Sequence, residues 1–493
     1  MKKTNVLFIV ADDLGYWALS SYGNKDAITP NLQKLSENGV QFENFFCVSP
    51  ICSPARASIF TGRIPSQHGI LDWLNEWQNG AETEEYLKGQ STFVDILAKN
   101  NYSCGLSGKW HMGASDKPQK GFNFWYCHQK GGGPYYGAPV YKNGTLIHEE
   151  EYITDRIADC GIEFIEESVK SPNPFFLALS FTAPHAPWGE AQHPKEILDL
   201  YRECQFNSCP REEDHPWKIY ETFSGDEAQR REVLRGYFGS LTSMDENIGR
   251  VIGKLKELGI YEDTLIVFTS DNGMNMGHHG FYGKGNGTSP LNMYDTSVKV
   301  PFIIAKGEEF KGVKTDAMLS HYDIRHTLLD YLGVEDELEE SVKFPGKSFS
   351  EILKGRDLEK EGHIVIYDEY GPTRMIRNRE YKYIHRYPDG PHEFYDLSKD
   401  ADEKENLIAD EKYSEEISKM RKELMTWFKN HVNPSIDGAQ LPVYGGGQSG
   451  LAGEWGGYRD KEIFERYTSD YIFTSDDRLD KNKKEIPEEN KVQ

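Results

Sequence analysis

The stretch Asn5-Val6-Leu7-Phe8-Ile9-Val10-Ala11-Asp12-Asp13 places an unbroken apolar run directly before two carboxylates. An apolar run without alternation is typical of a strand that is covered on both faces. The run is short for a signal peptide, and it ends in aspartates rather than in a small-residue cleavage site. We therefore interpret it as a buried strand with an acidic carboxyl end.

The same pattern recurs along the chain, with helical segments between the apolar runs. Pro30, which starts one such segment, suits the first turn of a helix. Alternating strands and helices predict a large mixed, mostly parallel sheet sandwiched by helices, joined by right-handed crossovers. Further strands are expected at 40–46, 102–106, 175–181, 264–269 and 301–305, helices at 30–36, 92–99, 153–168 and 248–258, and an irregular charged segment at 189–235.

Polar side chains follow four of these predicted strands. In open α/β sheets, ligands bind outside the carboxyl ends of the strands. Side chains delivered there by separate strands are therefore expected to meet at one edge. The residues concerned are Asp12 and Asp13, Lys109 and His111, His185, and Asp271 and Asn272.

The segment Cys52-Ser53-Pro54-Ala55-Arg56 predicts the start of a helix that leads towards Gly62. Pro54 suits the first turn, and glycine commonly ends a helix. Cys52 would then lie at a helix N-terminus, where an anion is favoured, and Arg56 could point back to it. A buried structural thiol is the alternative, but the helix start favours a reactive cysteine.

The pairs Asp12-Asp13 and Asp271-Asn272 offer oxygen ligands without cysteines or clustered histidines beside them. Ca²⁺ and Mg²⁺ prefer such ligands, whereas Zn²⁺ does so less. For an isolated pair, a helix cap or a turn would be the preferred interpretation, but two pairs at the ends of two buried strands favour a metal site. Candidates for anion binding and proton transfer are Lys109, His111, His185 and Lys284.

The character of the sequence changes near residue 362. Short strands separated by turn residues predict a small antiparallel sheet, followed by an amphipathic helix at 413–427. We expect an N-terminal α/β domain at 1–361 and a C-terminal subdomain at 362–493. The latter would contain a four-stranded sheet, a packed helix, a glycine-rich loop at 437–458 on the substrate side, and a charged tail.

Composition limits the class of protein. A net charge of −23 argues against general affinity for nucleic acid or anionic membranes. No apolar run approaches the ~18 residues that span a bilayer. Seven cysteines do not form an evident disulfide framework, although Cys204 and Cys209 are close enough in sequence to pair. The sequence as given is expected to be cytoplasmic.

Taken together, these motifs resemble the formylglycine-dependent (type I, Cys-type) sulfatases of the alkaline phosphatase superfamily. The Cys-x-Pro-x-Arg signature is present as Cys52, Pro54 and Arg56, with Thr61-Gly62 in its extended form. The other family motifs follow in order: Asp12-Asp13, Gly108-Lys109-Trp110-His111, His185 within Pro184-His185-Ala186-Pro187, Asp271-Asn272-Gly273, and Lys284. The resemblance covers about residues 5–400 and implies an alkaline-phosphatase-like α/β domain with a smaller C-terminal one.

The resemblance also implies a mechanism. A maturation enzyme oxidises Cys52 to formylglycine, and one hydroxyl of the hydrated aldehyde attacks sulfur and displaces the alcohol. A single divalent cation, expected to be Ca²⁺, would be held by Asp12, Asp13, Asp271, Asn272 and residue 52. Lys109 and Lys284 would neutralise sulfate oxygens, Arg56 and His111 would hold and deprotonate the diol, and His185 would protonate the leaving alcohol.

The substrate is hypothesised to be a sulfated carbohydrate, taken from a chain end. The polar and aromatic groups near the signature, together with Arg374, motivate this hypothesis, since a Trp beside an Asp offers a stacking face and a hydroxyl acceptor. Candidate substrate residues are His68, Asp72, Trp73 and Arg374. Alternatives are a phosphomonoester or phosphonate monoester hydrolase of the same superfamily, an inactive polyanion-binding relative, and a transferase.

Overall fold

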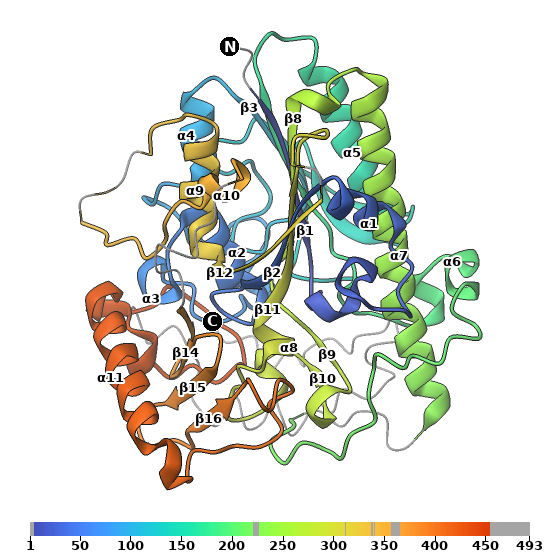
Figure 1. The fold of residues 1–493 in the computed structure, drawn as a ribbon. Helices are drawn as coiled ribbons and strands as arrows, with labels where there is room; N and C mark the ends of the chain where they lie inside the picture. Colours follow the sequence, from blue (N-terminus) through green and yellow to red (C-terminus); the bar gives the residue numbers. More distant parts are fainter. Residues whose placement is uncertain are drawn as a thin grey trace.

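The computed structural model describes residues 4–219, 226–310, 312–336, 339, 341–355 and 365–453. A ten-stranded sheet runs through the centre, in the order β12-β2-β11-β8-β1-β7-β3-β4-β5-β6. A separate four-stranded antiparallel sheet, β13-β14-β15-β16, lies in the C-terminal region with helix α11 against it (Figure 1). The predicted fold class is confirmed.

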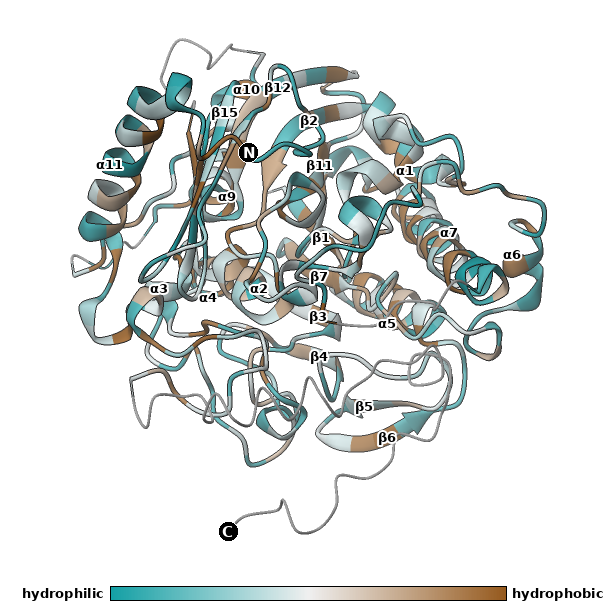
Figure 2. Cartoon of the chain, turned by 90° about the horizontal axis from the view of Figure 1, so that it is seen from below, coloured by the Kyte–Doolittle hydropathy of each residue, from teal (hydrophilic) through white to brown (hydrophobic). Residues whose placement is uncertain are grey.

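The central strand β1 explains why helices cover both faces of the large sheet. Its side chains alternate, so that Val6, Phe8 and Val10 enter one hydrophobic core. Leu7, Ile9 and Ala11 enter the other. Helices α2, α4 and α9 cover the first face, and α1, α5 and α7 cover the second (Figure 2). Burial on both faces is why the run contains no polar residue between Val6 and Ala11.

The strands of the large sheet are mostly parallel. Strand β1 pairs in parallel with β7 and β8, whereas β11 runs antiparallel to both of its neighbours. The strands are β1 Asn5–Ala11, β2 Gly39–Phe46, β3 Ser103–Lys109, β4 Phe124–His128, β5 Ala138–Lys142, β6 Thr145–Glu149, β7 Phe175–Ser180, β8 Thr264–Ser270, β11 Lys299–Ala305 and β12 Val313–Ser320. A small ribbon, β9 Asn275–Met276 with β10 Tyr282–Gly283, stands apart.

The helices match the expected order, with one correction. They are α1 Pro30–Glu37, α2 Cys52–Thr61, α3 Pro65–His68, α4 Phe93–Lys99, α5 Ile153–Ser168, α6 Lys195–Asp199, α7 Glu227–Glu257, α8 Asp295–Val298, α9 Ile324–Tyr331, α10 Ser350–Leu353 and α11 Ser414–His431. The prediction of irregular structure up to residue 235 was wrong, because α7 already begins at Glu227. Its first turns bury Val233 and Leu234 despite the many charges around them.

The small sheet comprises β13 Ile366–Tyr370, β14 Thr373–Arg377, β15 Tyr381–Arg386 and β16 Glu393–Asp396. Met420 and Leu424 of α11 pack on it, as the apolar spacing predicts, together with Phe428, which was not predicted. The division at residue 362 stays a prediction, since residues 356–364 lie outside the described part, as do residues 454–458 of the glycine-rich loop and the charged tail.

Two expectations about the whole chain can be compared with the structure. Within the described ranges, no helix has the length and apolarity needed to cross a membrane. All seven cysteines are unpaired thiols, including Cys204 and Cys209.

Candidate active site

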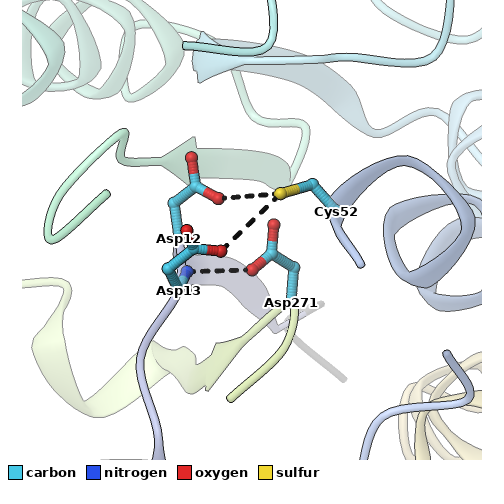
Figure 3. A group of neighbouring side chains, drawn as sticks. All are labelled: Asp12, Asp13, Cys52 and Asp271. Carbon is cyan, nitrogen blue, oxygen red and sulfur yellow. Dashed lines mark hydrogen bonds between the residues drawn. The ribbon is translucent and has the colours of Figure 1, made fainter. Parts of the chain in front are cut away.

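The carboxyl ends of β1 and β8 bring three carboxylates to one edge of the sheet. Asp12 and Asp13 follow β1, and Asp271 follows β8 (Figure 3). One ligand atom from each, together with Cys52 Sγ, lies within 4.8 Å of the others. The backbone N–H of Asp13 donates to Asp271 Oδ1 at 3.2 Å. Asp13 adopts a φ of 63°, a backbone conformation uncommon for a non-glycine residue.

Cys52 is the first residue of α2, as the signature predicts, and Gly62 ends that helix in the left-handed conformation with a φ of 72°. The thiol is buried, and Sγ lies 3.4 Å from Asp12 Oδ1 and 3.7 Å from Asp13 Oδ1. Burial raises the pKa of this thiol well above its ordinary value, although nearby lysines oppose the shift. The cysteine therefore stays protonated at neutral pH and is a poor thiolate nucleophile.

Arg56 lies one turn further along α2 and joins three strand ends. Its Nε donates to Asp271 Oδ2 at 2.8 Å, and its Nη1 donates to Ser180 Oγ at 2.7 Å and to the Lys109 carbonyl at 3.2 Å. The side chain is almost fully buried, and Nη2 has no hydrogen-bond partner among the described residues. This nitrogen lies 3.6 Å from Asp12 Oδ1 in an ion pair, so it can donate a hydrogen bond to an anionic oxygen that enters the site.

Two ammonium groups pair with different carboxylates of the cluster. Lys109, the last residue of β3, places Nζ 2.6 Å from Asp12 Oδ2. Lys284 follows β10; its Nζ pairs with Asp13 Oδ1 and lies 2.8 Å from Cys52 Sγ. The two lysines thus flank the cysteine and partly neutralise the carboxylates.

The pKa values reflect this balance. Burial raises the pKa of Asp12 to about 7, with Lys109 only partly opposing the shift. For Asp13, burial is outweighed by Lys284 and His185, so its pKa lies below the ordinary value. Burial raises the pKa of Asp271, but Arg56 and Lys109 together outweigh it, so the pKa lies below the ordinary value.

This cluster fits a divalent cation. It contains three buried carboxylates, and the side-chain oxygen of Asn272 is buried without a hydrogen-bond partner in the described structure. The Asn272 amide nitrogen donates to Asp13 Oδ1 at 2.8 Å, which places the amide beside the same oxygens. Oxygen ligands of this kind suit a hard cation.

His111 follows β3 and is held in one tautomer. Its Nε2 lies 3.1 Å from the Leu74 carbonyl, which can only accept a hydrogen bond, so Nε2 carries the proton. Nδ1 is buried without a partner among the described residues. Burial, reinforced by Lys109, lowers the pKa of His111 well below its ordinary value. The ring therefore presents an unprotonated Nδ1 as a proton acceptor.

His185 follows β7 in the opposite tautomer. Its Nδ1 donates to the Ala186 carbonyl at 2.7 Å, so Nε2 is the free nitrogen. Nε2 lies 3.7 Å from Asp13 Oδ2, and the side chain is 26% exposed. Burial lowers the pKa of His185 to about 4, with Asp13 opposing the shift. This histidine stands at the exposed side of the cluster.

All four candidate substrate residues have partners inside the protein. His68 is buried, with Nε2 at 3.2 Å from Ser58 Oγ and Nδ1 accepting from the Ile70 N–H at 3.1 Å. Arg374 is buried in an ion pair with Glu369 at 3.3 Å and a second one with Asp437, and its guanidinium lies 4.1 Å from the Phe428 ring centre. Neither geometry supports contact with a substrate.

The other two join the glycine-rich loop to the segment after α3. Asp72 accepts from Tyr370 Oη at 2.5 Å and from the Gly447 N–H at 3.1 Å. Trp73 Nε1 donates to the Gly445 carbonyl at 2.9 Å, and its side chain is partly exposed. The described part of the loop therefore packs directly beside this segment.

One residue near the cluster was missed by sequence reasoning. His128 ends β4, the strand parallel to β3 on its outer side. Burial and, to a smaller extent, Lys109 and His185 lower its pKa to about 4, which reflects its place beside those two residues. The strand at 124–128 was not predicted; recognising it would have added His128 by the same strand-end rule.

Comparison with protein families decides the class. The family model described as Sulfatase matches residues 4–334, about two thirds of the chain. This chain belongs to the sulfatase family. A second model, described as the C-terminal region of N-sulphoglucosamine sulphohydrolase, matches residues 277–430 of the sulfatase.

Named relatives extend over most of the sulfatase. It is 28% identical to N-acetylglucosamine-6-O-sulfatase of Bacteroides thetaiotaomicron, covering 86% of this chain and 85% of the relative. It is 27% identical to an ulvan-active sulfatase of Formosa agariphila (82% and 77% covered) and 28% identical to human arylsulfatase A (82% and 83% covered). These matches establish it as a sulfuric ester hydrolase.

Solved structures confirm the fold of the sulfatase. A protein solved with its substrate D-glucosamine-2-N,6-O-disulfate matches with a TM-score of 0.76 at 23% identity, covering 90% of this chain and all of that one. The phosphonate monoester hydrolase of Agrobacterium radiobacter matches with a TM-score of 0.63 at 21% identity, covering 87% and 96%. The same fold therefore occurs in a protein that binds a sulfated sugar and in a phosphonate monoester hydrolase. The fold alone does not decide between the two reactions, so the residues of the site must.

Proposed function

We propose that this sulfatase hydrolyses the sulfate monoester of a sulfated carbohydrate, and that Cys52 is matured to formylglycine before the enzyme becomes active. The observation that carries the proposal is the state of Cys52. Its thiol is buried among Asp12, Asp13 and Lys284 with a raised pKa, so it is badly suited to attack as a thiolate. Its position is suited to an oxygen nucleophile, which the hydrated aldehyde supplies after maturation.

The cationic side chains would bind the sulfate group. Lys109 and Lys284 flank residue 52, and Arg56 has a buried Nη2 with no hydrogen-bond partner in the described residues. Such preorganised positive charge stabilises the oxygens on which charge develops in the transition state. Because these groups are also paired with Asp12, Asp13 and Asp271, they are fixed before substrate arrives.

A divalent cation, which we propose is Ca²⁺, would be held by Asp12, Asp13, Asp271 and Asn272. When bound, it supplies Lewis-acid polarisation of a sulfate oxygen. The carboxylates orient the site, and Arg56 anchors Asp271 from the other side at 2.8 Å. The amide of Asn272 can present its partnerless oxygen to the same point.

The two histidines divide the proton transfers. His111 would accept a proton at Nδ1, because the Leu74 carbonyl keeps the other proton on Nε2. His185 would protonate the departing alcohol from Nε2 in its imidazolium form, because its Nδ1 proton stays with the Ala186 carbonyl. Asp13 Oδ2, which lies 3.7 Å from Nε2, favours that protonated form. The opposite tautomers leave a different ring nitrogen available on each histidine, Nδ1 on His111 and Nε2 on His185.

We favour a carbohydrate as the alcohol that carries the sulfate, with the sulfated sugar taken from a chain end. Relatives named for N-acetylglucosamine-6-O-sulfate and ulvan support this class, although choline-sulfatase and arylsulfatases are equally similar in sequence. In this chain, the partly exposed Trp73 beside the 444–450 loop offers a stacking surface at the edge of the site.

Mass spectrometry of the peptide that contains Cys52 tests maturation. The enzyme is produced together with a formylglycine-generating maturation enzyme, and conversion of cysteine is expected as a loss of about 18 Da. Activity should follow the converted fraction, and Cys52→Ala should fold but not turn over. Equal turnover by fully unconverted protein would contradict the proposal.

A substrate panel tests the reaction class. The matured enzyme is given sulfated monosaccharides, 4-nitrophenyl sulfate, choline sulfate, and phosphate and phosphonate monoesters. We expect the highest kcat/KM on a sulfated sugar. Preferential cleavage of phosphonate esters would favour the alternative hydrolase, and turnover of only aryl or choline sulfate would exclude the carbohydrate assignment.

A further inference from the structure

Three consecutive glycines, at 131–133, form the loop that follows β4 at the edge of the sheet where the site lies. They are half-buried, and none of the three has a φ in the left-handed region. Their backbone conformation is therefore open to other residues, and glycine is not required here for conformational freedom. What distinguishes them is the space beside each one.

Gly131 lies directly against the imidazole of His111. A side-chain carbon built on Gly131 would fall 2.2 Å from both Cε1 and Nε2 of that ring. The ring cannot move aside freely, because it is buried and its Nε2 donates to the Leu74 carbonyl. An added methyl group would have to displace the ring and break that hydrogen bond.

The next two glycines face two other histidines, with more room. A carbon on Gly132 would lie 2.9 Å from Cε1 of His185, and one on Gly133 would lie 3.0 Å from Cε1 of His128. An added side-chain carbon would therefore lie closer to the His111 ring than to the His185 ring. Of these two rings, His185 is also the more exposed, so it has more freedom to shift.

The segment that holds the His111 ring through its hydrogen bond to the Leu74 carbonyl is itself held in place. Leu74, which accepts its hydrogen bond, pairs with Gln448 in an isolated bridge, and its own N–H donates to Ser53 Oγ at 3.0 Å. Lys130, just before the glycines, forms an ion pair of 2.8 Å with Glu76, just after Leu74. The glycine loop and the Leu74 segment are thus tied together around the ring.

From this geometry, and resting on the roles proposed above for His111 and His185, we propose that the glycines at 131 and 132 are positioning residues for the two proton transfers. The absence of a side chain at Gly131 leaves room for the His111 ring beside the Leu74 carbonyl, whose hydrogen bond fixes the tautomer and leaves Nδ1 as the acceptor. Gly132 keeps the face of His185 clear, so that Nε2 can reach the departing oxygen. Neither glycine touches the reacting atoms through a side chain.

The first test compares Gly131→Ala, Gly132→Ala and the control Gly253→Ala in the matured enzyme. Gly253 lies on α7 with no atom within 4 Å of an added carbon, so its variant should keep wild-type kcat. Gly131→Ala should lower kcat about 100-fold on every substrate with little change in KM, the scale of a lost proton transfer. Gly132→Ala should lower kcat on a sugar sulfate more than on 4-nitrophenyl sulfate, whose leaving group needs no acid.

The second test is a double-mutant cycle with His111→Ala, measured in both kcat and Tm. If the added methyl group acts through the ring, Gly131→Ala lowers both quantities in the wild type and neither in the His111→Ala background. If Gly131→Ala alone fails to fold, the double variant should restore folding. The inference would be overturned if Gly131→Ala kept the wild-type kcat, or if it lowered kcat and Tm equally in the wild type and in the His111→Ala background. It would also be overturned if the double variant failed to fold.

The double-mutant cycle measured in Tm does not require an active enzyme. It therefore tests the contact between Gly131 and His111 separately from the proposed catalytic function. A wild-type enzyme that is inactive on all sulfate esters, with coupling of Gly131 and His111 in Tm, would contradict the proposed function and support the contact. If the enzyme is active and Gly131 and His111 are coupled in Tm but not in kcat, the contact is supported and only the positioning role is overturned.

Discussion

Arg56 shows how one side chain can hold an active site together. Its guanidinium binds Asp271, Ser180 and the Lys109 carbonyl, which come from the ends of β8, β7 and β3. A lysine at this position would keep the positive charge. Its ammonium group lacks the planar set of N–H donors with which the guanidinium reaches all three acceptors. The value of arginine here lies in its geometry.

Arg56→Lys is therefore expected to lower kcat/KM by at least ~100-fold and the free energy of unfolding by about 3 kcal/mol, since buried carboxylates lose partners. Steady-state kinetics and urea denaturation measure the two effects. Arg202→Lys is the matched control, because Arg202 is 60% exposed and its one ion pair within the described ranges is with the partly exposed Asp199. Equal stability of the Arg56 and Arg202 variants would contradict the argument.

His185 allows a sharper test of its proposed role. If it protonates the departing alcohol, His185→Gln should lower kcat on a sugar sulfate by ~10²–10⁴-fold, the usual range for general acid catalysis. On 4-nitrophenyl sulfate, whose leaving group is stable as an anion, the loss should be much smaller. Equal losses on both substrates would show that His185 binds sulfate rather than moves a proton.

At the scale of elements, Asp72 connects the small sheet, the glycine-rich loop and the segment after α3. It is fully buried, and burial raises its pKa to about 6, with the hydrogen bond from Tyr370 opposing the shift. A carboxyl whose pKa is higher in the folded than in the unfolded state loses stability as the pH rises. The loss begins near the unfolded pKa of 3.8 and is complete above about 6.

Asp72→Asn removes this titration. Between pH 4 and pH 7, the wild type should lose up to ~3 kcal/mol more unfolding free energy than the variant does. Urea denaturation of both proteins at several pH values gives this difference, in which the titration of the other carboxyls cancels. A difference that does not change with pH would mean that Asp72 ionises normally in the folded protein.

At the scale of the whole molecule, the acidic cluster couples metal binding to stability. Asp12, Asp13 and Asp271 place three carboxylates close together in the folded chain, so a bound cation should favour the folded state. At a free concentration of 100 times Kd, the gain is about 2.7 kcal/mol. Thermal unfolding with Ca²⁺ or with EGTA should show a higher Tm with the ion. An unchanged Tm would argue against the site.

Asp271→Asn supplies the control for the metal measurement. It keeps the size of the side chain but removes one charged ligand, so the Ca²⁺-dependent rise in Tm should largely disappear. Asp199→Asn, a change on the partly exposed α6, should retain the full rise. Equal responses of the two variants would place the ion elsewhere.

Much of the fold and of the candidate site could be predicted from the sequence, because both follow from local rules. Strands buried on both faces are visible as unbroken apolar runs, and their polar ends must meet at one edge of a parallel sheet. The gathering of Asp12, Lys109 and Asp271 follows directly. The start of α2 at Cys52 was predictable from Pro54 in the same way.

The remainder depended on tertiary partners that a single sequence does not reveal. Arg374 resembled a substrate ligand, yet it pairs with Glu369 and Asp437 inside the C-terminal region. His68 likewise finds Ser58 on α2. The start of α7 was missed because its first turns are rich in charge, and its helical state depends on a few buried side chains such as Val233.

The pairing of β1 with β8 has a consequence for biosynthesis. Asp13 and Asp271, which meet at the ends of these strands, are 258 residues apart in the chain. At a translation rate of ~5–20 residues per second, roughly 10–50 s separate their emergence from the ribosome. Until then β1 lacks one neighbour, and Cys52 cannot yet be enclosed by Asp271 or Lys284. The order of synthesis thus leaves an interval in which the nascent cysteine is accessible to another protein.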